Sequence, residues 1–102
     1  MPEGALTLAC FEPLVGSSFS LRLDGAAELP ARLIAARAGV RVDLGTGLAG
    51  RQPFSLTFQA PAEPALPQRI YRLEHPQLEA MDIFLVPVAR SAAGLHYEAV
   101  FG

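Results

Sequence analysis

Hydrophobic and polar residues alternate along three short stretches of the chain. Ser17 to Asp24 and Pro53 to Gln59 carry leucine or phenylalanine at every second position, with mostly small polar or charged residues between. In Ile70 to His75, Tyr71 and Leu73 alternate with charged residues in the same way. A period of two places alternate side chains on opposite faces of a β-strand. All three stretches are therefore predicted to be half-buried strands.

The segment from Leu29 to Ala38 fits two structures. Its alanine, leucine and arginine residues favour a helix, for which Pro30 suits the first turn and Gly39 the C-cap. Alternation is present as well, with leucine and alanine on one side and Ile34 on the other. We predict a strand, because residues 25–27 have the composition of a hairpin connection to the preceding strand.

The last third of the chain predicts an antiparallel hairpin. Its arms are Met81 to Val88 and Leu95 to Phe101, and its turn is Arg90 to Gly94. The first arm is apolar on both faces, so alternation alone does not choose its register. A slip by one residue would exchange the inward and outward sets of side chains.

The expected register places Val88 opposite Leu95. The side chains that then line the core are Phe84, Val86, Tyr97, Ala99 and Phe101. Those that fall on the outer face are Ile83, Leu85, His96 and Glu98. The outer face would thus carry an apolar stripe, which is typical of an interaction surface.

The first residues predict one short helix. Thr7 is the N-cap candidate, apolar residues recur at helical spacing after it, and Gly16 ends the segment. Pro13 keeps the helix short because it lacks an amide donor. We expect this helix to close one open end of the folded sheet.

Two segments read as connections. Gly39 to Gln52 is rich in glycine, and Gly45 to Gly50 has the spacing Gly-x-Gly-x-x-Gly. No hydrophobic parallel strand precedes it and Pro53 blocks a following helix, so a loop is favoured over a nucleotide site. Ala60 to Gln68 contains three prolines, which predict an extended connection.

These elements predict a mainly β fold. About six strands with short antiparallel connections and one short N-terminal helix fit a small antiparallel β-barrel or roll. At 102 residues and 51% hydrophobic side chains, the chain supports a single domain over residues 1–102.

Charge and cysteine content narrow the classes of function. The formal net charge of −2 argues against a nucleic-acid partner, because phosphate binding needs a clustered basic surface. The single Cys10 excludes an internal disulfide. No signal segment or apolar run of membrane-spanning length occurs, so we expect a cytoplasmic protein with no membrane partner.

Two histidines and a carboxylate supply the residue types of a metal site. His75, His96 and Asp82 would form a set of two histidines and one carboxylate. No short-range ligand spacing brings them together, so surface histidines or histidines that hydrogen-bond at strand ends are favoured. We expect no metal and no other cofactor.

No catalytic residue stands out. Cys10 would need a base beside it, and an apolar helix is expected to raise the pKa of its thiol. Glu74 with Glu79, and Asp82 with Glu98, are the carboxylate pairs that could converge, although exposed strand carboxylates are commonly only solvated. We therefore expect a protein that is not an enzyme.

The interface candidates are the outward residues of the predicted strands. They are Ile83, Leu85, His96, Glu98 and Ile34. The alternative is that the N-terminal helix or the proline-rich segment covers the apolar stripe.

Several motifs resemble a small bacterial family of unknown function. They are Phe11-Glu12-Pro13-Leu14-Val15-Gly16, Pro53-Phe54-Ser55-Leu56, Leu66-Pro67-Gln68, Tyr71-Arg72-Leu73-Glu74-His75-Pro76, Phe84-Leu85-Val86-Pro87 and Tyr97-Glu98-Ala99-Val100-Phe101. The resemblance spans nearly the whole chain, and the high alanine content is where this chain departs from it. It supports a strand at Leu29 to Ala38 and implies no activity, cofactor or catalytic residue.

The resemblance also suggests a biological setting. Members occur near genes for phage-tail-like collar proteins, which implies an accessory or assembly role. Four residues of the shared motifs could instead be strand-end hydrogen-bonding groups that fix the fold, namely Glu12, Glu74, His75 and Glu98.

We therefore expect a non-enzymatic structural or protein-interaction module that binds itself or another protein. The alternative is a small-molecule or metal-binding barrel with a cavity lined by Phe54, Phe58, Tyr71 and Tyr97. A barrel of about six strands has little spare interior, which favours the first expectation.

Overall fold

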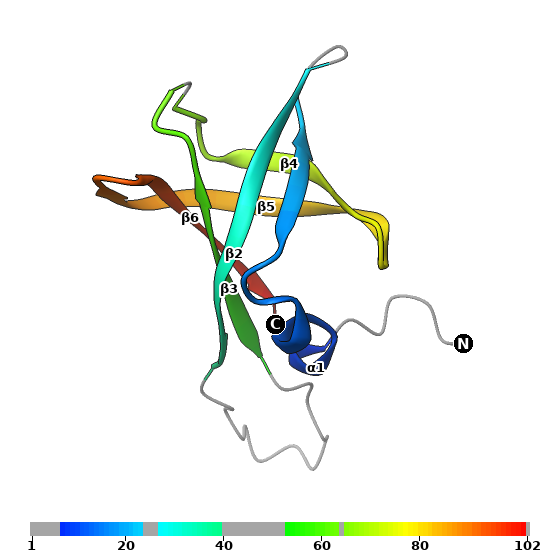
Figure 1. The fold of residues 1–102 in the computed structure, drawn as a ribbon. Coiled ribbons are helices and arrows are strands. Elements are labelled where there is room, and N and C mark those ends of the chain that lie inside the picture. Colours follow the sequence, from blue (N-terminus) through cyan, green and yellow to red (C-terminus); the bar gives the residue numbers. More distant parts are fainter. Residues whose placement is uncertain (1–6, 24–26, 40–52, 64, 102) are drawn as a thin grey trace.

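The computed structural model describes residues 7–23, 27–39, 53–63 and 65–101, and these form a closed β-barrel (Figure 1). The strands are β1 (Ser18–Arg22), β2 (Glu28–Ala38), β3 (Phe54–Ala60), β4 (Arg69–His75), β5 (Leu78–Ser91) and β6 (Gly94–Phe101). Around the barrel they follow the order β1-β2-β3-β6-β5-β4, and all neighbours are antiparallel. The predicted fold class, a small antiparallel barrel with one short N-terminal helix, is confirmed.

The long strand β5 serves two neighbours in turn. Its first part pairs with β4, from His75 opposite Leu78 to Arg69 opposite Leu85. Its second part pairs with β6, beginning at Val86 opposite Glu98. This change of partner along one strand lets six strands close into a barrel.

Alternate residues of each strand fill the barrel. In β3, Phe54, Leu56 and Phe58 are buried and the residues between them are only half-buried, as the sequence predicts. Tyr71 and Leu73 of β4 also face inward, as predicted. The described part of the chain has no buried polar or charged residue other than tyrosine. Removal of this apolar surface from water is the main stabilising contribution to the fold.

The segment from Glu28 to Ala38 is a strand, which confirms the choice of strand over helix. It pairs with β1, with Leu23 N–H donating to the Ala27 carbonyl at 2.9 Å, while residues 24–26 of the connection lie outside the described part. The register with β3 shifts between Leu33 and Ala35. Ile34 is the extra residue of this β-bulge, so the inward side continues at Ala36 instead of Ala35.

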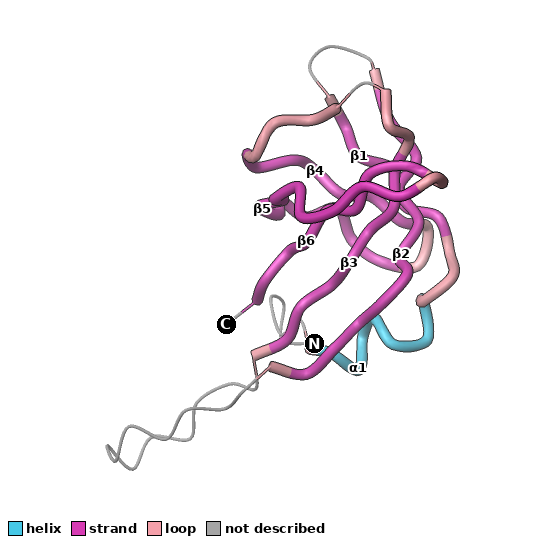
Figure 2. The backbone as a smooth tube through the Cα atoms, turned by 90° about the vertical axis from the view of Figure 1, so that its left-hand side faces the viewer, coloured by secondary structure: helices cyan, strands magenta, loops and turns pink. Residues whose placement is uncertain are grey.

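A short helix lies at one end of the barrel, beside the lower part of β2 in Figure 2. α1 (Leu8–Phe11) continues into a 3₁₀ turn, η1 (Glu12–Leu14), and Gly16 ends the segment with a φ of 97°. Thr7 holds the N-cap position with no side-chain cap hydrogen bond. Phe11 is fully buried, and its ring lies 5.9 Å from the rings of both Phe54 and Phe101. The expected role of the helix as a plug is therefore confirmed.

The proline-rich segment packs against the core at Leu66. Leu66 is buried, and its N–H donates to the hydroxyl of Tyr97 at 2.9 Å. The hydroxyl of Tyr71 donates to the Pro67 carbonyl at 2.6 Å. Both hydroxyls thus hold a segment whose prolines cannot donate to a strand ladder.

The hairpin of β5 and β6 has a different register from the one expected. Pro87, not Val86, lies opposite Tyr97, and a bulge before Ala89 takes up the extra residue Val88. Ile83 and Leu85 are consequently buried, with 4% and 0% of their surface exposed. The predicted outward orientation of these two residues is wrong, because the β5 arm is slipped by one residue relative to β6.

The slip exchanges inward and outward residues in only one of the two arms, β5. Tyr97 and Ala99 of β6 face the core, as predicted, and Phe101 packs against it. On β5, Phe84 is 49% exposed, and both it and Val86 belong to the outer face instead of the core.

Gly94 explains why this hairpin turns where it does. Its φ is 143°, and a Cβ there would collide with the backbone carbonyl of Ala60. Glycine allows both the turn and the close approach of β3.

Two sequence expectations lie partly or wholly outside the described residues. The Gly-x-Gly-x-x-Gly spacing at Gly45 to Gly50 is one, and most of the loop from Gly39 to Gln52 is the other. Within the described ranges, no helix has the length and hydropathy that crossing a bilayer requires.

Candidate interaction surface

The outer side of β4 and β5 carries neighbouring exposed apolar side chains. Ile70 lies directly opposite Phe84 in the β4–β5 ladder, and they are 64% and 49% exposed. Val86, two residues further along β5, lies on the same outer side and is half-buried. We call these three residues, Ile70, Phe84 and Val86, the outer apolar stripe. Val88 and Val100 are exposed apolar residues further along β5 and on β6.

The segments that the sequence offered as covers do not bury the stripe. The helix lies against the barrel end, where Phe11 meets Phe54 and Phe101. The proline-rich segment buries Leu66 against Tyr97 instead. A paired isoleucine and phenylalanine left in water carry a hydrophobic cost that binding would remove.

The predicted interface residues separate into two groups. Ile83 and Leu85 are part of the core and cannot contact a partner. His96, Glu98 and Ile34 are half-buried residues of the barrel wall, on β6 and at the β2 bulge. Glu98 lies opposite Val86 and so borders the outer apolar stripe.

Sequence reasoning missed Phe84 and Ile70 as surface residues. The register expected from the sequence places Phe84 in the core, because a strand that is apolar on both faces has no polar side to orient it. The available signal was the alternation of Tyr71 and Leu73 in β4, which already places Ile70 on the outer side. Pairing of β4 with β5 then determines the orientation of Phe84.

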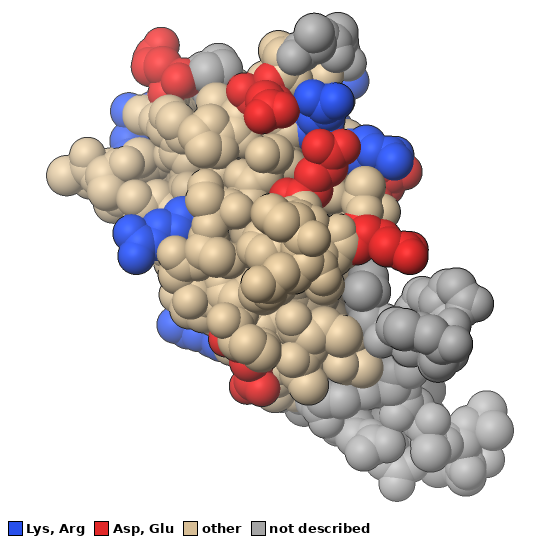
Figure 3. Space-filling view, turned by 45° about the vertical axis from the view of Figure 1, so that its right-hand side comes forward, with Lys and Arg blue, Asp and Glu red and all other residues tan. Residues whose placement is uncertain are grey.

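A charged row borders the stripe on its other side. Arg22 contacts Glu28 at 3.1 Å and Glu74 at 3.6 Å, while Arg72 contacts Glu74 at 3.7 Å and Asp82 at 3.9 Å. We call these five residues the charged ladder. Figure 3 shows acidic and basic groups interleaved in the upper part of the face in view. The ladder contributes little stability, since such exposed pairs are worth roughly 0–1 kcal/mol each.

His75 is a structural hydrogen-bonding residue at the end of β4. Its Nδ1 accepts the Gln77 N–H at 3.0 Å, which leaves the proton of the neutral ring on Nε2. Nε2 then donates to Ser17 Oγ at 3.2 Å, and Ser17 donates to the Leu14 carbonyl at 2.6 Å. In this arrangement His75 takes no proton from Ser17, so the two groups do not form a nucleophile and base.

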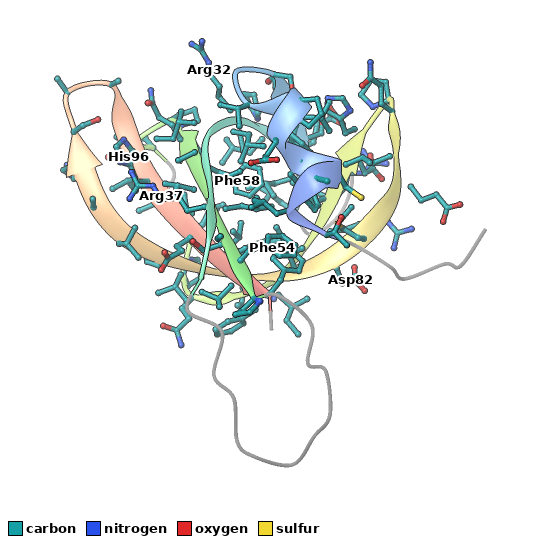
Figure 4. All side chains as sticks on the ribbon, turned by 90° about the horizontal axis from the view of Figure 1, so that it is seen from below. Arg32, Arg37, Phe54, Phe58, Asp82 and His96 are labelled. Atoms are coloured by element: carbon teal, nitrogen blue, oxygen red, sulfur yellow. The ribbon has the colours of Figure 1, made fainter. Side chains whose placement is uncertain are left out.

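The two histidines do not converge. His75 lies opposite Leu78 and His96 opposite Ala89 on the same strand β5. Eleven residues separate these partners, which corresponds to about 36 Å along a strand. Figure 4 shows His96 and Asp82 on opposite sides of the barrel. Within the described ranges, no group of three histidine, cysteine, aspartate or glutamate side chains is arranged to hold a metal ion.

Cys10 differs from its expected behaviour. Hydrogen bonding from the Thr7 backbone, and then from the Thr7 hydroxyl, lowers the pKa of the Cys10 thiol more than burial raises it. Thr7 Oγ1 lies 3.6 Å from the sulfur. The prediction of a raised pKa is wrong, because a half-exposed helix start supplies donors that hydrophobicity alone does not reveal.

The aromatic residues expected to line a ligand cavity belong to the packed core. The ring of Phe58 lies 5.4 Å from that of Phe19, and Figure 4 shows Phe54 and Phe58 inside the ring of strands. Tyr71 and Tyr97 direct their hydroxyls to the proline-rich segment. Among the described side chains, no buried nitrogen or oxygen lacks a hydrogen-bond partner. The core thus presents no unpaired polar group to a ligand.

The family model described as a domain of unknown function, DUF6916, matches residues 6–101. The chain belongs to this family. The match covers every strand of the barrel and the plugging helix, which agrees with the resemblance seen across the sequence motifs. Searches of curated proteins and of solved structures gave no match.

Proposed function

We propose that this DUF6916 domain is a non-enzymatic structural module that associates with another copy of its own chain through the outer apolar stripe. The observation that carries the proposal is the exposed pair of Ile70 and Phe84 on the barrel wall. Both side chains are large, and association would remove them from water together.

The internal chemistry of the barrel supports a role without catalysis. The tyrosine hydroxyls and His75 are engaged in hydrogen bonds that hold segments of the fold. The Cys10 thiol has a lowered pKa, and the polar side chain that its sulfur contacts is that of Thr7, which is not a base. Nucleophilic catalysis would need a reactive group and a base positioned together.

An accessory role in a phage-tail-like assembly is part of this proposal. The family resemblance motivates it, and a small, filled barrel with one apolar outer stripe suits a module that contacts other copies. The alternative of a metal-binding barrel loses its support because His75 and His96 belong to distant points along β5.

The test is the mass of the protein in solution. Sedimentation velocity from about 10 µM to 1 mM is expected to show a monomer–dimer equilibrium, because a contact well below the usual roughly 800 Å² per partner gives weak association. Phe84→Ser should abolish the dimer, whereas the control Val15→Ser, which changes an exposed residue near the helix, should not. A wild-type protein that stays monomeric throughout contradicts the proposal.

A further inference from the structure

Glu98 is an acidic residue beside an apolar surface. It is half-buried in β6, opposite Val86 of the outer apolar stripe and Thr57 of β3. Among the ion pairs of the described residues, none includes Glu98. A partly desolvated carboxylate gains most from a cation brought close to it.

The nearest ordered cation of the charged ladder lies on the far side of Phe84. Arg72 is opposite Asp82 on β5, one same-face step before Phe84, and Glu98 is opposite Val86, one step after it. Arg72 and Glu98 therefore occupy opposite corners of a small grid of three strands, with Phe84 at its centre. With strands about 4.8 Å apart and same-face residues about 6.6 Å apart, roughly 16 Å separates the corners, too far for a pair within one chain.

A second copy can bring the two corners together. The two copies would face each other with their outer apolar stripes in contact. They would be related by a twofold axis that lies in the plane between them, passes over Phe84 and runs at right angles to the line from Arg72 to Glu98. Rotation about this axis sets Arg72 of one copy against Glu98 of the other, and does so twice. The same rotation brings Ile70 near Val86 of the other copy and Phe84 against its own equivalent. Such an isologous contact is self-complementary in both charge and hydrophobicity.

We propose that the domain forms a symmetric dimer in this register, with Phe84 on the twofold axis and two Arg72–Glu98 ion pairs between the copies. This inference rests on the proposed function, because it takes the outer apolar stripe as the contact surface. It goes further by fixing the partner's orientation and by giving Glu98 a counter-charge, which no ion pair among the described residues supplies.

In this register, Arg72 would form ion pairs both within its own chain and with the other copy. Within its own chain it bridges Glu74 and Asp82 at 3.7 and 3.9 Å, distances that leave its guanidinium only loosely held. With 56% of its side chain exposed, it has room to reach a carboxylate on the facing copy. The Arg72–Glu98 pair would therefore add a partner to the ladder without dismantling it.

Charge reversal tests the register. Glu98→Arg places two cations against each other in each pair, and Arg72→Glu places two anions there, so each should raise the dimer dissociation constant at least tenfold. The double variant R72E/E98R restores opposite charges and should return the constant to within about threefold of wild type. Sedimentation velocity on each variant measures these constants.

Two controls separate the register from the fold. Arg22→Glu disturbs the same charged ladder one strand further from Phe84, and should leave the dimer unchanged. Thermal melting of all variants at about 5 µM shows whether the monomer is intact, and Glu98→Arg leaves the ladder itself untouched. Comparison with Glu98→Gln, which removes the charge without reversing it, should give an intermediate constant.

The outcomes distinguish this inference from the proposed function. If Phe84→Ser loses the dimer and R72E/E98R does not restore it, the proposed register is wrong, but association through the outer apolar stripe is still supported. A dimer insensitive to both Phe84→Ser and charge reversal overturns both. Rescue by the double variant supports both.

Discussion

The two sides of strand β5 carry nearly the same kind of residue and have opposite environments. Ile83 and Leu85 face the barrel interior and are almost completely buried, whereas Phe84 between them is 49% exposed. The outer side also meets Ile70 of β4 and Glu98 of β6, so apolar and charged groups are mixed there. Burial in the folded monomer accounts for the hydrophobic residues on the inner side of β5. It does not account for those on the outer side, and this difference is the reason to propose a contact with another molecule.

The largest expected difference between the sides is in stability. Leu85→Ala should lower the free energy of unfolding by about 2–5 kcal/mol, because it opens a cavity in the filled core. The matched change Phe84→Ala should cost well under about 1 kcal/mol when the protein is dilute and monomeric, since half of the ring is already in water. Urea unfolding at low micromolar concentration measures both. Equal losses would mean that the outer side is packed like the inner one.

Loss of a buried polar group should lower the free energy of unfolding more than loss of an exposed one. Tyr97→Phe removes the acceptor of the Leu66 N–H and leaves that buried donor unpaired, at a cost of about 1–3 kcal/mol. Urea unfolding measures the loss, and amide hydrogen exchange at Leu66 should accelerate with it. An unchanged unfolding midpoint would show that the proline-rich segment does not depend on this hydrogen bond.

On the outer side, the charged ladder should contribute little. Arg22→Gln breaks two exposed ion pairs and should cost less than about 1 kcal/mol, because solvent and salt screen such pairs. The difference from wild type should shrink further in about 1 M NaCl. A loss above 2 kcal/mol that persists in salt would contradict this view of the ladder.

The smallest effect is expected at Cys10, in the helix that plugs the barrel. Thr7→Val removes the hydroxyl near the thiol but keeps the backbone hydrogen bond that lowers the pKa most. The thiol pKa should rise, so that at neutral pH alkylation of Cys10 slows by about two- to fivefold. The pH midpoint of the alkylation rate reports the shift. A midpoint that stays the same or moves lower would exclude a role for the hydroxyl.

The sequence predicts which side chains face inward only where polar and apolar residues alternate along a strand. In β3, serine, threonine and glutamine alternate with Phe54, Leu56 and Phe58, so the inner face was unambiguous. In β5 both faces are apolar, and only pairing with β4 and β6 decides between Phe84 and Leu85. Bulges at Ile34 and Val88 also shift the alternation, and no glycine next to either residue marks the bulge in the sequence.

The sequence predicts an apolar stripe on the outer face of the barrel, but it assigns the wrong residues to that stripe. An apolar stripe beside His96 and Glu98 follows from a strand that is hydrophobic on both sides. Its members are Ile70, Phe84 and Val86, because the register is slipped by one residue from the one expected. The orientation of Glu98 toward the stripe, and its lack of an ion pair among the described residues, are tertiary properties that no local pattern encodes.

The central claim is that the outer apolar stripe is where copies of this chain meet. A dilution series of ¹⁵N-labelled protein, followed by NMR from about 1 mM to 20 µM, tests it at single residues. The account predicts concentration-dependent amide shifts gathered at Ile70, Phe84, Val86 and Glu98, with the buried Leu21 and Leu56 unaffected. Shifts that are absent, or that gather around Val15 and the helix instead, would contradict it.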